Sequence, residues 1–422
     1  MSANKINRLK GTQDIMSQEA CLWQEIEDTA RDTALVYGYR PIRTPIIEQT
    51  CLFARSSGEE SDIVKKQIYS FSDQGKREIC LRPEATASVC RAYIENCLDK
   101  TEGFVKFFYS GPMFRSERPQ AGRFRQFHQI GVEAIGSYSV YLDAEVIMLL
   151  NDILKRSGVA GCVFHINSLG CDKDKSVIKE KIRQALKPAL DELCPDCRRR
   201  YDTNTLRILD CKVSSCKKII SGIELNGALC DECAKAFSSL EGILKKAGIG
   251  YTVDDKLVRG LDYYTGIVFE VKSKSLGAQD ALAAGGRYDN LISDFGGPRA
   301  GATGFALGME RIAQIIKDEN PSRYCQPEGL KVFIVCLGDK ARNMCFGILS
   351  DLRKENISCD MDYESRSFKA QMRHANKIKS EFVVIVGDEE LEKGECVLKD
   401  MKDSSQRHLR FDRLASNLNA VK

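Results

Sequence analysis

The spacing of apolar residues along the chain predicts where helices and strands lie. Ser17 to Tyr37 carries apolar side chains three or four positions apart with charges between them, which predicts a half-buried helix. Gly38 to Glu48 contains two prolines and several β-branched residues, so we expect an extended edge or interface strand there. Helical spacing returns in Leu142 to Leu154 and in Met309 to Ile316.

Two short apolar segments flank a stretch that is rich in arginine. Lys106 to Tyr109 and Gln129 to Ile135 have the composition of strands, and the Arg-Pro-Gln-Ala-Gly sequence between them supplies turn residues. We therefore expect an antiparallel pair of strands whose ends and connecting loop hold the arginines. Further strands are predicted at Val163 to Ile166, Gly266 to Lys272 and Thr303 to Leu307.

Two regions differ in pattern from this core. Residues 172–248 are rich in Lys and Arg, helical in pattern around Val177 to Leu186, and contain six cysteines, so we interpret them as an inserted helical domain. A proline-containing linker is expected at residues 321–329. The last unit, residues 330–422, alternates three apolar strands with two amphipathic helices, which predicts a small α/β unit with parallel strands.

Length and composition limit the class of protein. A chain of 422 residues exceeds one ordinary core, so two or three domains are expected. No apolar run approaches the roughly 20 residues of a membrane helix, and the N-terminus lacks the apolar segment of a signal peptide, so we expect a cytoplasmic protein. The net charge of +4 is mild, and nucleic acid would have to bind local basic patches. The 18 cysteines are spread over the chain, which argues against a disulfide scaffold.

The arginine-rich stretch, Met113 to Gln129, reads MFRSERPQAGRFRQFHQ. Its four arginines are Arg115, Arg118, Arg123 and Arg125. Arginine binds phosphate or carboxylate oxygens in two places at once, so the stretch suits a nucleoside triphosphate, and a solvated strand face is the alternative. Two later segments favour the ligand: Leu257 to Phe269 places an arginine beside two tyrosines, and Ala284 to Arg311 combines many glycines with a terminal Glu-Arg pair.

These segments resemble the motifs of class II aminoacyl-tRNA synthetases. Residues 114–129 resemble motif 2, residues 304–311 resemble motif 3, and Pro45 resembles the motif 1 proline of the dimer interface. The segments RGLDYY, residues 259–264, and GGRYD, residues 285–289, are similar to the two signatures of the histidyl-tRNA synthetase family, in its bacterial type. The resemblance extends over essentially the whole chain.

The resemblance implies a fold and an activity. The expected fold is an α+β catalytic domain with an antiparallel sheet, made by residues 1–171 and 249–320, with a helical insertion at 172–248 and a C-terminal α/β anticodon-binding domain at 330–422. The implied reaction is ATP-dependent ligation of L-histidine to tRNA(His) through a histidyl-adenylate, with release of AMP and diphosphate. ATP is then a substrate that acts with Mg²⁺, tRNA(His) is the partner, and the enzyme is a homodimer.

The resemblance also assigns roles in ATP binding and catalysis. Arg115 and Arg259 are expected to hold the α-phosphate from opposite sides as the catalytic residues. Arg311 is expected to clamp the far end of ATP. Glu117 and Arg123 complete the expected ATP site.

Histidine recognition is expected to depend on Glu133 and Tyr264, which meet the imidazole ring in the family. Glu133 lies in an apolar strand where an unpaired carboxylate is costly, which favours a ligand over a surface salt bridge. The other histidine-binding residues implied by the resemblance are Glu84, Thr86, Gln129, Tyr263 and Tyr288. For His128 we expect a structural hydrogen bond within its strand, since the family's second step can use the adenylate phosphate as its base.

The insertion carries candidate zinc ligands and basic runs. Two C-x-x-C pairs, Cys194 with Cys197 and Cys230 with Cys233, are 32 residues apart, and a site formed by Cys211, Cys216, Cys230 and Cys233 is the alternative that spacing leaves open. Reduced structural cysteines without metal are the other interpretation. The basic runs at residues 198–200 and 217–218 suit contacts with the tRNA acceptor stem, and a solvated face is their ordinary explanation.

Two rival functions share this resemblance. A catalytically inactive paralogue serves as a regulatory subunit of ATP phosphoribosyltransferase, but it typically lacks the C-terminal domain and loses motif residues. This chain retains Arg115, Arg259, Arg311 and a full C-terminal unit. A synthetase-like amino-acid sensor fused to other domains is the second rival, and the chain has no segment left for a further domain.

Overall fold

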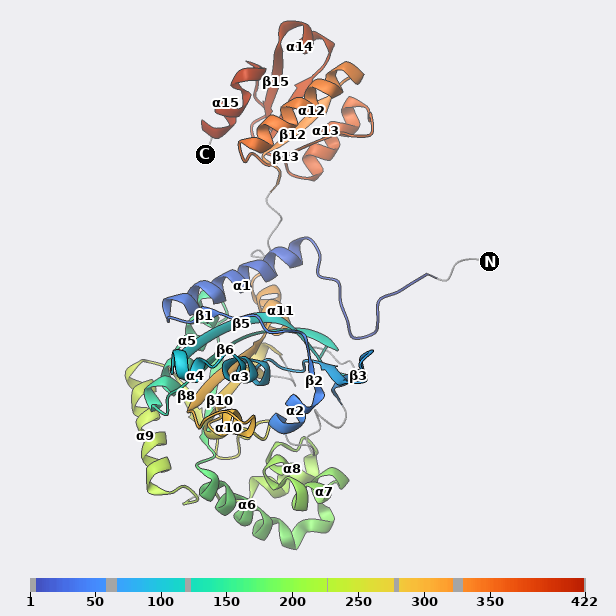
Figure 1. The fold of residues 1–422 in the computed structure, drawn as a ribbon. Coiled ribbons are helices and arrows are strands. Elements are labelled where there is room, and N and C mark those ends of the chain that lie inside the picture. Colours follow the sequence, from blue (N-terminus) through green and yellow to red (C-terminus); the bar gives the residue numbers. More distant parts are fainter. Residues whose placement is uncertain are drawn as a thin grey trace. The chain divides into compact units, whose positions relative to one another are not determined.

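The computed structural model describes residues 5–57, 67–117, 123–225, 227–276, 281–321 and 329–420. The chain forms two compact units, residues 1–324 and 325–422 (Figure 1). Arg118 and most of the linker expected at residues 321–329 lie outside the described residues. Among the helices of the described ranges, none is both long and apolar enough to cross a membrane.

An eight-stranded sheet organises the first unit. Its order is β1-β5-β6-β11-β10-β9-β7-β8. The strands in that order are β1 (Arg40–Pro41), β5 (Val105–Phe114), β6 (Gln126–Ile135), β11 (Ala302–Gly308), β10 (Ala281–Arg287), β9 (Thr265–Ser273), β7 (Cys162–Ser168) and β8 (Tyr251–Val253). Every pair is antiparallel except β1 with β5 and β7 with β8 at the two edges. The predicted α+β core is therefore confirmed, with strands longer than the sequence pattern indicated.

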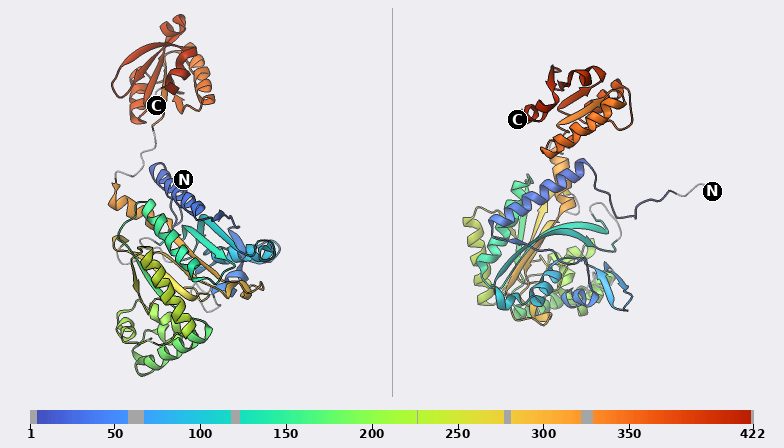
Figure 2. Two further views of the ribbon diagram at one scale, coloured as in Figure 1. Left: turned by 90° about the vertical axis from the view of Figure 1, so that its left-hand side faces the viewer. Right: turned by 45° about the horizontal axis from the view of Figure 1, so that its top comes forward.

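Helices cover one face of this sheet (Figure 2). Among them are α1 (Gln18–Val36), α5 (Val140–Arg156) and α11 (Met309–Glu319). Their apolar faces pack with alternate residues of β6, namely Ile130, Val132 and Ala134. Because side chains alternate across a strand, the other residues of β6 point to the opposite face of the sheet.

A small sheet and short helices flank the far end of β5. The sheet has the order β2-β4-β3, with β2 (Ile47–Gln49), β4 (Glu78–Leu81) and β3 (Tyr69–Ser72). Nearby helices are α2 (Thr50–Ser57), α3 (Thr86–Glu95), α4 (Leu98–Thr101) and α10 (Leu291–Asp294). The Arg82 guanidinium links β4 to β5 by donating to the Pro112 carbonyl at 3.1 Å and to the Thr44 carbonyl at 3.0 Å. This link fixes the start of α3 relative to the large sheet.

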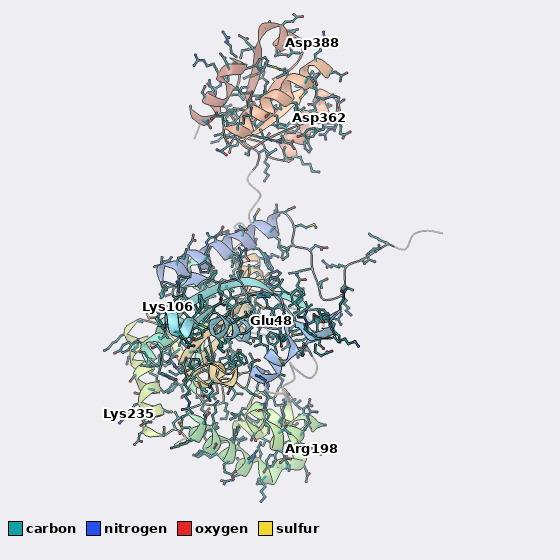
Figure 3. All side chains as sticks on the ribbon, in the orientation of Figure 1. Glu48, Lys106, Arg198, Lys235, Asp362 and Asp388 are labelled. Carbon is teal, nitrogen blue, oxygen red and sulfur yellow. The ribbon has the colours of Figure 1, made fainter. Side chains whose placement is uncertain are left out.

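The insertion is helical throughout its described residues. It contains α6 (Asp172–Leu186), η2 (Lys187–Glu192), α7 (Pro195–Thr203), η3 (Thr205–Asp210), α8 (Ser214–Ser221) and α9 (Asp231–Lys246). Its buried Ile182, Ile208 and Ile220 belong to the same apolar core as Tyr263 and Tyr264. Basic side chains such as Arg198 and Lys235 are exposed on its surface (Figure 3).

The second unit is a five-stranded sheet of order β13-β12-β14-β15-β16. Its elements are β12 (Val332–Cys336), α12 (Asp339–Lys354), β13 (Cys359–Met361), α13 (Phe368–Lys377), β14 (Phe382–Val386), α14 (Asp388–Lys393), β15 (Glu395–Asp400), β16 (Gln406–Arg410), η6 (Phe411–Arg413) and α15 (Leu414–Ala420). The three predicted strands are parallel, as expected, and β15 and β16 extend the sheet in the antiparallel sense.

Candidate active site

A cavity of about 250 Å³ opens on the face of the sheet opposite α1 and α5. Strands β6, β10 and β11 contribute lining residues to its floor. Strand β9 lies beside β10, and η4 (Lys274–Leu276) follows β9. All twelve residues that the sequence assigned to ATP and histidine line this one cavity: Glu84, Thr86, Arg115, Glu117, Arg123, Gln129, Glu133, Arg259, Tyr263, Tyr264, Tyr288 and Arg311. The structure therefore brings together segments that lie far apart in the sequence.

Alternation along β6 decides which of its side chains reach the cavity. Phe127, Gln129 and Glu133 point into it, whereas His128 belongs to the alternate set. The His128 backbone N–H donates to Glu310 Oε1 at 2.9 Å, and its ring meets the Trp23 ring edge-on at 4.8 Å between centroids. The hydrogen-bond partner of His128 is therefore Glu310 of α11, and not a residue of its own strand as we expected.

Glu133 is the most buried acid of the cavity, with 1% of its surface exposed. Its Oε1 accepts hydrogen bonds from Thr86 Oγ1 at 2.7 Å and from the Tyr109 hydroxyl at 3.3 Å. Its Oε2 accepts from the Tyr288 hydroxyl at 2.5 Å. Burial raises the pKa of the Glu133 carboxyl from 4.5 to about 8, although the three hydroxyl donors lower it in part. In the free protein this carboxyl therefore holds its proton near neutral pH.

Glycines make the space that this cluster needs. A Cβ atom at Gly131 would lie 2.2 Å from the Tyr109 hydroxyl oxygen, and one at Gly304 would lie 2.1 Å from Glu133 Oε2. Gly304 pairs directly with Glu133 across β11 and β6. Only glycine at these two positions lets the carboxylate and the tyrosine occupy the same face of the sheet.

The residues before and after Tyr288, Arg287 and Asp289, are fixed by ion pairs and hydrogen bonds. The Arg287 guanidinium is buried and pairs with Asp143 at 2.8 Å and with Asp289 at 3.0 Å. Asp289 also accepts the Ala302 backbone N–H at 2.9 Å. Arg287 does not line the cavity, so within its signature segment it acts as an anchor that orients the tyrosine.

Glu84 has a structural task in addition to the predicted one. Its carboxylate accepts the backbone N–H groups of Thr86 at 2.5 Å and Ala87 at 3.1 Å, at the start of α3. Burial raises the pKa of the Glu84 carboxyl, and these backbone donors oppose the shift. Glu84 therefore orients Thr86 toward Glu133, and its oxygens lie at the cavity wall.

Arginines concentrate positive charge in the rest of the cavity. Arg115 donates through Nε to the Pro83 carbonyl at 3.0 Å and lies 5.1 Å from the centre of the Phe127 ring. Burial lowers the pKa of Arg115 and of Arg311, and the charge of Arg123 lowers that of Arg311 further. Burial acts in the same direction on Arg259, but Glu270 outweighs it, and the net pKa of Arg259 is raised. This arrangement suits an anionic ligand.

Two buried polar atoms in the cavity have no hydrogen-bond partner among the described residues. They are Gln129 Oε1 and Arg259 Nε. Buried polar atoms in folded proteins are nearly always paired, and each exception requires an explanation. A ligand with both hydrogen-bond donors and acceptors, such as an amino acid joined to a phosphate, would satisfy both atoms.

Several residues of this site were not identified from the sequence, and three of them make specific contacts with predicted residues. Glu270 receives a hydrogen bond from Arg259 Nη1 at 2.6 Å, Tyr109 bonds Glu133, and Phe127 packs under Arg115. Alternation alone could have found Phe127, because it stands two and six positions before Gln129 and Glu133. Glu270 and Tyr109 depend on which strands become neighbours, and no local pattern carries that information.

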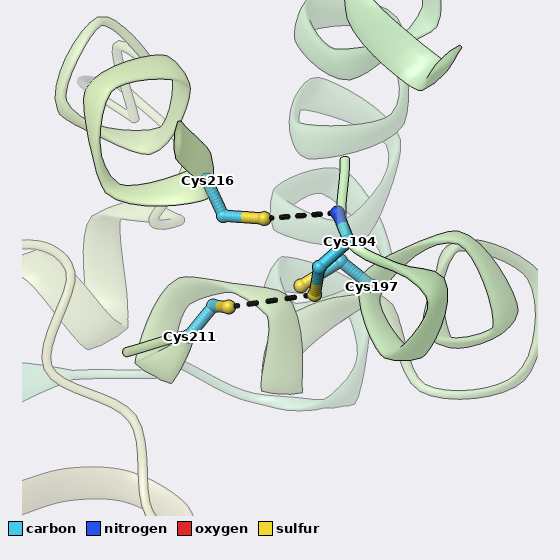
Figure 4. A group of neighbouring side chains, drawn as sticks. All are labelled: Cys194, Cys197, Cys211 and Cys216. Carbon is cyan, nitrogen blue, oxygen red and sulfur yellow. Dashed lines mark hydrogen bonds between the residues drawn. The ribbon is translucent and has the colours of Figure 1, made fainter. Parts of the chain in front are cut away.

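Four cysteines of the insertion meet between α7 and α8 (Figure 4). The sulfur atoms of Cys194, Cys197, Cys211 and Cys216 all lie within 4.8 Å of one another. The sulfurs of Cys194 and Cys211 are 3.8 Å apart, and the Cys194 backbone N–H donates to the Cys216 sulfur at 3.2 Å. Zinc–sulfur bonds of about 2.3 Å in a tetrahedron place sulfurs about 3.8 Å apart, so this cluster has the dimensions of a zinc site.

This cluster consists of four of the six candidate cysteines, but it matches neither of the two ligand sets that spacing suggested. Cys230 and Cys233 lie instead beside Cys171 and Asp174. The reason is the path of the chain: η3 turns back so that Cys211 faces the start of α7, whereas α9 begins next to the start of α6. Spacing identified the C-x-x-C pairs but not their neighbours in space.

Comparison with known proteins gives this site a family context. A model of the histidyl-tRNA synthetase family matches residues 11–312, and a model of an anticodon binding domain matches residues 331–420. The histidine--tRNA ligase of Desulforamulus reducens is 45% identical over 403 residues, which are 95% of this chain and 96% of that protein. The apo histidyl-tRNA synthetase of S. aureus superimposes with a TM-score of 0.83 at 34% identity, over 98% of this chain and 100% of that one.

A more distant structure shares the fold alone. It is described as an ATP phosphoribosyltransferase regulatory subunit/histidyl-tRNA synthetase, from Bacillus halodurans C. It is 20% identical, with a TM-score of 0.66, over 92% of this chain and 99% of that one. At this distance, the residues of the cavity and not the fold distinguish between functions.

The raised pKa of Glu133 predicts a pH-dependent stability. Between pH 4.5 and about 8 the unfolded chain has released this proton while the native protein keeps it, so the free energy of unfolding falls as pH rises through that window. Glu133→Gln removes this dependence. From about pH 5 to about pH 8, wild type should lose on the order of a few kcal/mol relative to the variant in denaturant unfolding. Glu95→Gln, on an exposed side chain of α3, is the control, and parallel curves for wild type and Glu133→Gln would contradict the assignment.

Proposed function

Because the chain belongs to the histidyl-tRNA synthetase family, we propose that its arginine-lined cavity is where histidine and ATP react and where histidine passes to tRNA. The chain catalyses ATP-dependent attachment of histidine to tRNA(His), with a histidyl-adenylate as intermediate. The observation that supports the location is the single cavity that joins the Glu133 cluster to four arginines, Arg115, Arg123, Arg259 and Arg311, from separate segments of the chain. Substrate recognition and phosphate chemistry are therefore combined in one site.

Activation joins the histidine carboxylate to the α-phosphorus of ATP, and the bond to the bridging oxygen of diphosphate breaks. Arg115 and Arg259 bind the α-phosphate from opposite sides and stabilise the charge that develops there. Arg311 binds the far end of ATP, and Glu117 with Arg123 completes that part of the site. Arg115 is pre-oriented by its bond to the Pro83 carbonyl, which reduces reorganisation during the reaction.

ATP enters as its magnesium complex. The cavity carboxylates of Glu117 and Glu310 offer the oxygen donors that Mg²⁺ prefers, so these residues fit the ion. Held by these carboxylates, the ion would neutralise part of the phosphate charge. The arginines supply the remaining positive charge from the protein itself.

Histidine is recognised by groups that its imidazole ring alone can satisfy. Glu133 and Tyr264 bind the two ring nitrogens, with Tyr263 and Tyr288 as walls. Glu84, Thr86 and Gln129 bind the substrate amino group, and the unpaired Gln129 Oε1 is suited to accept from it. An amino acid without these nitrogens leaves buried polar groups unpaired, which typically discriminates by a factor of about 10⁴ or more.

Transfer to tRNA requires a hydroxyl of the terminal adenosine to attack the carbonyl carbon, with AMP leaving. His128 is bonded to Glu310 and packed on Trp23, away from the cavity, so we assign the proton to a phosphate oxygen of the adenylate. The C-terminal unit binds the anticodon. Exposed basic residues of the insertion, including Lys217 and Lys218, contact the acceptor-stem backbone.

The regulatory-subunit alternative has less support. Its inactive paralogue typically loses motif residues and the C-terminal domain, whereas residues 331–420 of this chain match the anticodon binding domain. Arg115, Arg259 and Arg311 all line the cavity. We place the enzyme in the cytoplasm, where its substrates meet.

A homodimer is proposed for the assembly. Large apolar side chains are exposed on both sides of the extended segment that contains Pro45: Leu35 and Val36 at the end of α1, and Ile46 and Ile47 at β2. Exposed apolar clusters of this kind mark interfaces. The same segment contacts β5 through the Ile42 N–H and the Phe108 carbonyl, at 2.8 Å, so assembly supports the strand that leads to Arg115.

The cysteine cluster of Cys194, Cys197, Cys211 and Cys216 is proposed to bind one zinc ion. Four thiolates at these distances form a closed tetrahedral site, which is structural in character. The cluster joins α7, η3 and α8. Zinc bound there would therefore stabilise the middle of the insertion.

Arg259→His should depress activation more than transfer. Loss of one preorganised donor costs on the order of 3–4 kcal/mol in the transition state, or about 10²–10³ in rate. Single-turnover rates measured separately for adenylate formation and for transfer from preformed adenylate test this split. The exposed Arg299→His is the matched control. Equal losses in both steps would assign Arg259 to the shape of the pocket only.

Ile47→Asp should convert an active dimer into an inactive monomer, because it places a charge in the proposed interface. Sedimentation velocity with wild type and variant measures the assembly, and pyrophosphate exchange measures activity. Val177→Asp, at an exposed apolar residue of the insertion, should change neither. A wild-type monomer with full activity would contradict the proposal.

The double change Cys194→Ser with Cys197→Ser should remove one zinc equivalent per chain and lower the unfolding temperature of the insertion. Metal analysis after chelator washing gives the stoichiometry, and far-ultraviolet circular dichroism follows folding. Cys51→Ser, at an exposed cysteine outside the insertion, is the control. A wild-type chain that retains no zinc and folds normally would refute the site.

A further inference from the structure

A second cluster of possible metal ligands, three thiols and one carboxylate, lies at the place where the insertion leaves and rejoins the sheet. Cys171 directly precedes α6, and Cys230 directly precedes α9, with Asp174 and Cys233 in the first turns of those helices. One ligand atom from each of the four residues lies within 4.8 Å of all the others. Asp174 is buried, and Cys230 and Cys233 are half-buried.

The backbone holds these four side chains in place. Asp174 Oδ2 accepts the Cys171 N–H at 3.2 Å, and Asp174 Oδ1 accepts the Cys230 N–H at 3.0 Å. Both helices thus present their N-terminal ends to the same point. Helix N-termini carry partial positive charge, which favours ionised thiols and carboxylates, the forms that bind metals.

Helix capping alone accounts for only part of this cluster. A cap at α6 requires Asp174, but it does not require the cysteines at positions 171, 230 and 233 to point to the same carboxylate. Cysteine is also not among the preferred capping residues. The first cluster repeats the device: Cys194 directly precedes α7, and Cys197 lies in its first turn. Both clusters place a cysteine directly before a helix and a second ligand in the first turn of that helix. This shared arrangement favours the same role for both, namely metal binding.

We propose that Cys171, Asp174, Cys230 and Cys233 form a second zinc site, distinct from the Cys194 cluster. Three thiolates and one carboxylate form a closed tetrahedral donor set for this ion. The site joins the first helix of the insertion to its last helix. Closing a loop of this length restricts the unfolded chain and stabilises the fold of the insertion.

The second site is connected to the active-site wall by two hydrogen bonds. The Leu169 N–H donates to the Gly266 carbonyl at 2.7 Å, and the Gly266 N–H donates to the Gly170 carbonyl at 2.9 Å. Gly170 has a φ of 65°, and a Cβ there would lie 2.3 Å from Asp174 Oδ2. The turn that leads into Cys171 is therefore packed directly against the carboxylate ligand. Gly266 stands two positions after Tyr264, so the metal fixes the base of the histidine pocket.

Metal content of the full chain tests the proposal without substrates, so its outcome is independent of the roles assigned to the cavity. Wild type should hold two zinc ions per chain. Cys230→Ser with Cys233→Ser should hold one, and adding Cys194→Ser with Cys197→Ser should leave none. Cobalt substitution into the chain without Cys194 and Cys197 should show thiolate-to-cobalt charge transfer of a site with three thiolates. Cys97→Ser, at an exposed cysteine, is the control and should keep two.

Asp174→Asn provides a milder test if the cysteine variants do not fold. It preserves the size of the side chain and loses the charged ligand. Loss of a residue that merely supports a ligand costs about 10- to 100-fold in metal affinity, so one of the two zinc ions should be bound at least about 10-fold more weakly in chelator competition. Asp172→Asn, on the neighbouring exposed carboxylate, should leave both affinities unchanged. The proposal is overturned if the chain without Cys194 and Cys197 holds no zinc, if the Cys230 and Cys233 variant keeps as much zinc as wild type, if Asp174→Asn releases zinc like wild type, or if thiol counting finds a disulfide between Cys230 and Cys233.

Discussion

The burial of one carboxylate, that of Glu133, is the constraint on which the active site depends. A buried carboxyl without partners is costly, and here three hydroxyl groups satisfy it. They come from Thr86 at the start of α3, Tyr109 on β5 and Tyr288 after β10. These elements must therefore reach their places together. Arg287, Glu84 and Arg82 serve that end, because each fixes the backbone from which a partner of Glu133 projects.

Unlike Glu133, whose partners satisfy it, the arginines of the cavity repel one another. In the free protein the charges of Arg123 and Arg115 lower the pKa of Arg311, so like charges repel within a partly buried cavity. An anionic ligand relieves that repulsion on binding. Repulsion between the arginines lowers the stability of the free protein. Functional sites commonly keep such a destabilising arrangement because ligand binding requires it. The apolar core between the far face of the sheet and α1, α5 and α11 stabilises the fold against this cost.

Much of the site could be predicted from the sequence because its residues occur in contiguous motifs that resemble known ones. For Glu133, the family resemblance and its position in an apolar strand were enough to predict that it lies in the cavity. It was insufficient where partners come from distant segments: Glu270 meets Arg259 through the packing of β9, and Cys211 meets Cys194 through a turn in the insertion. Strand β15 was missed for a different reason. Only Cys396 and Leu398 are buried in it, and two positions are too few to show a period.

Gly304 has a consequence for how this enzyme can change over generations. The space next to Glu133 exists because that residue has no side chain, and any replacement adds atoms within 2.1 Å of the carboxylate. Mutation at this position can narrow the pocket but never widen it. A substitution that lets the pocket accept larger amino acids must therefore occur at another position. Because glycine has no side chain to lose, no mutation of Gly304 can reduce the accuracy of histidine selection by enlarging the pocket.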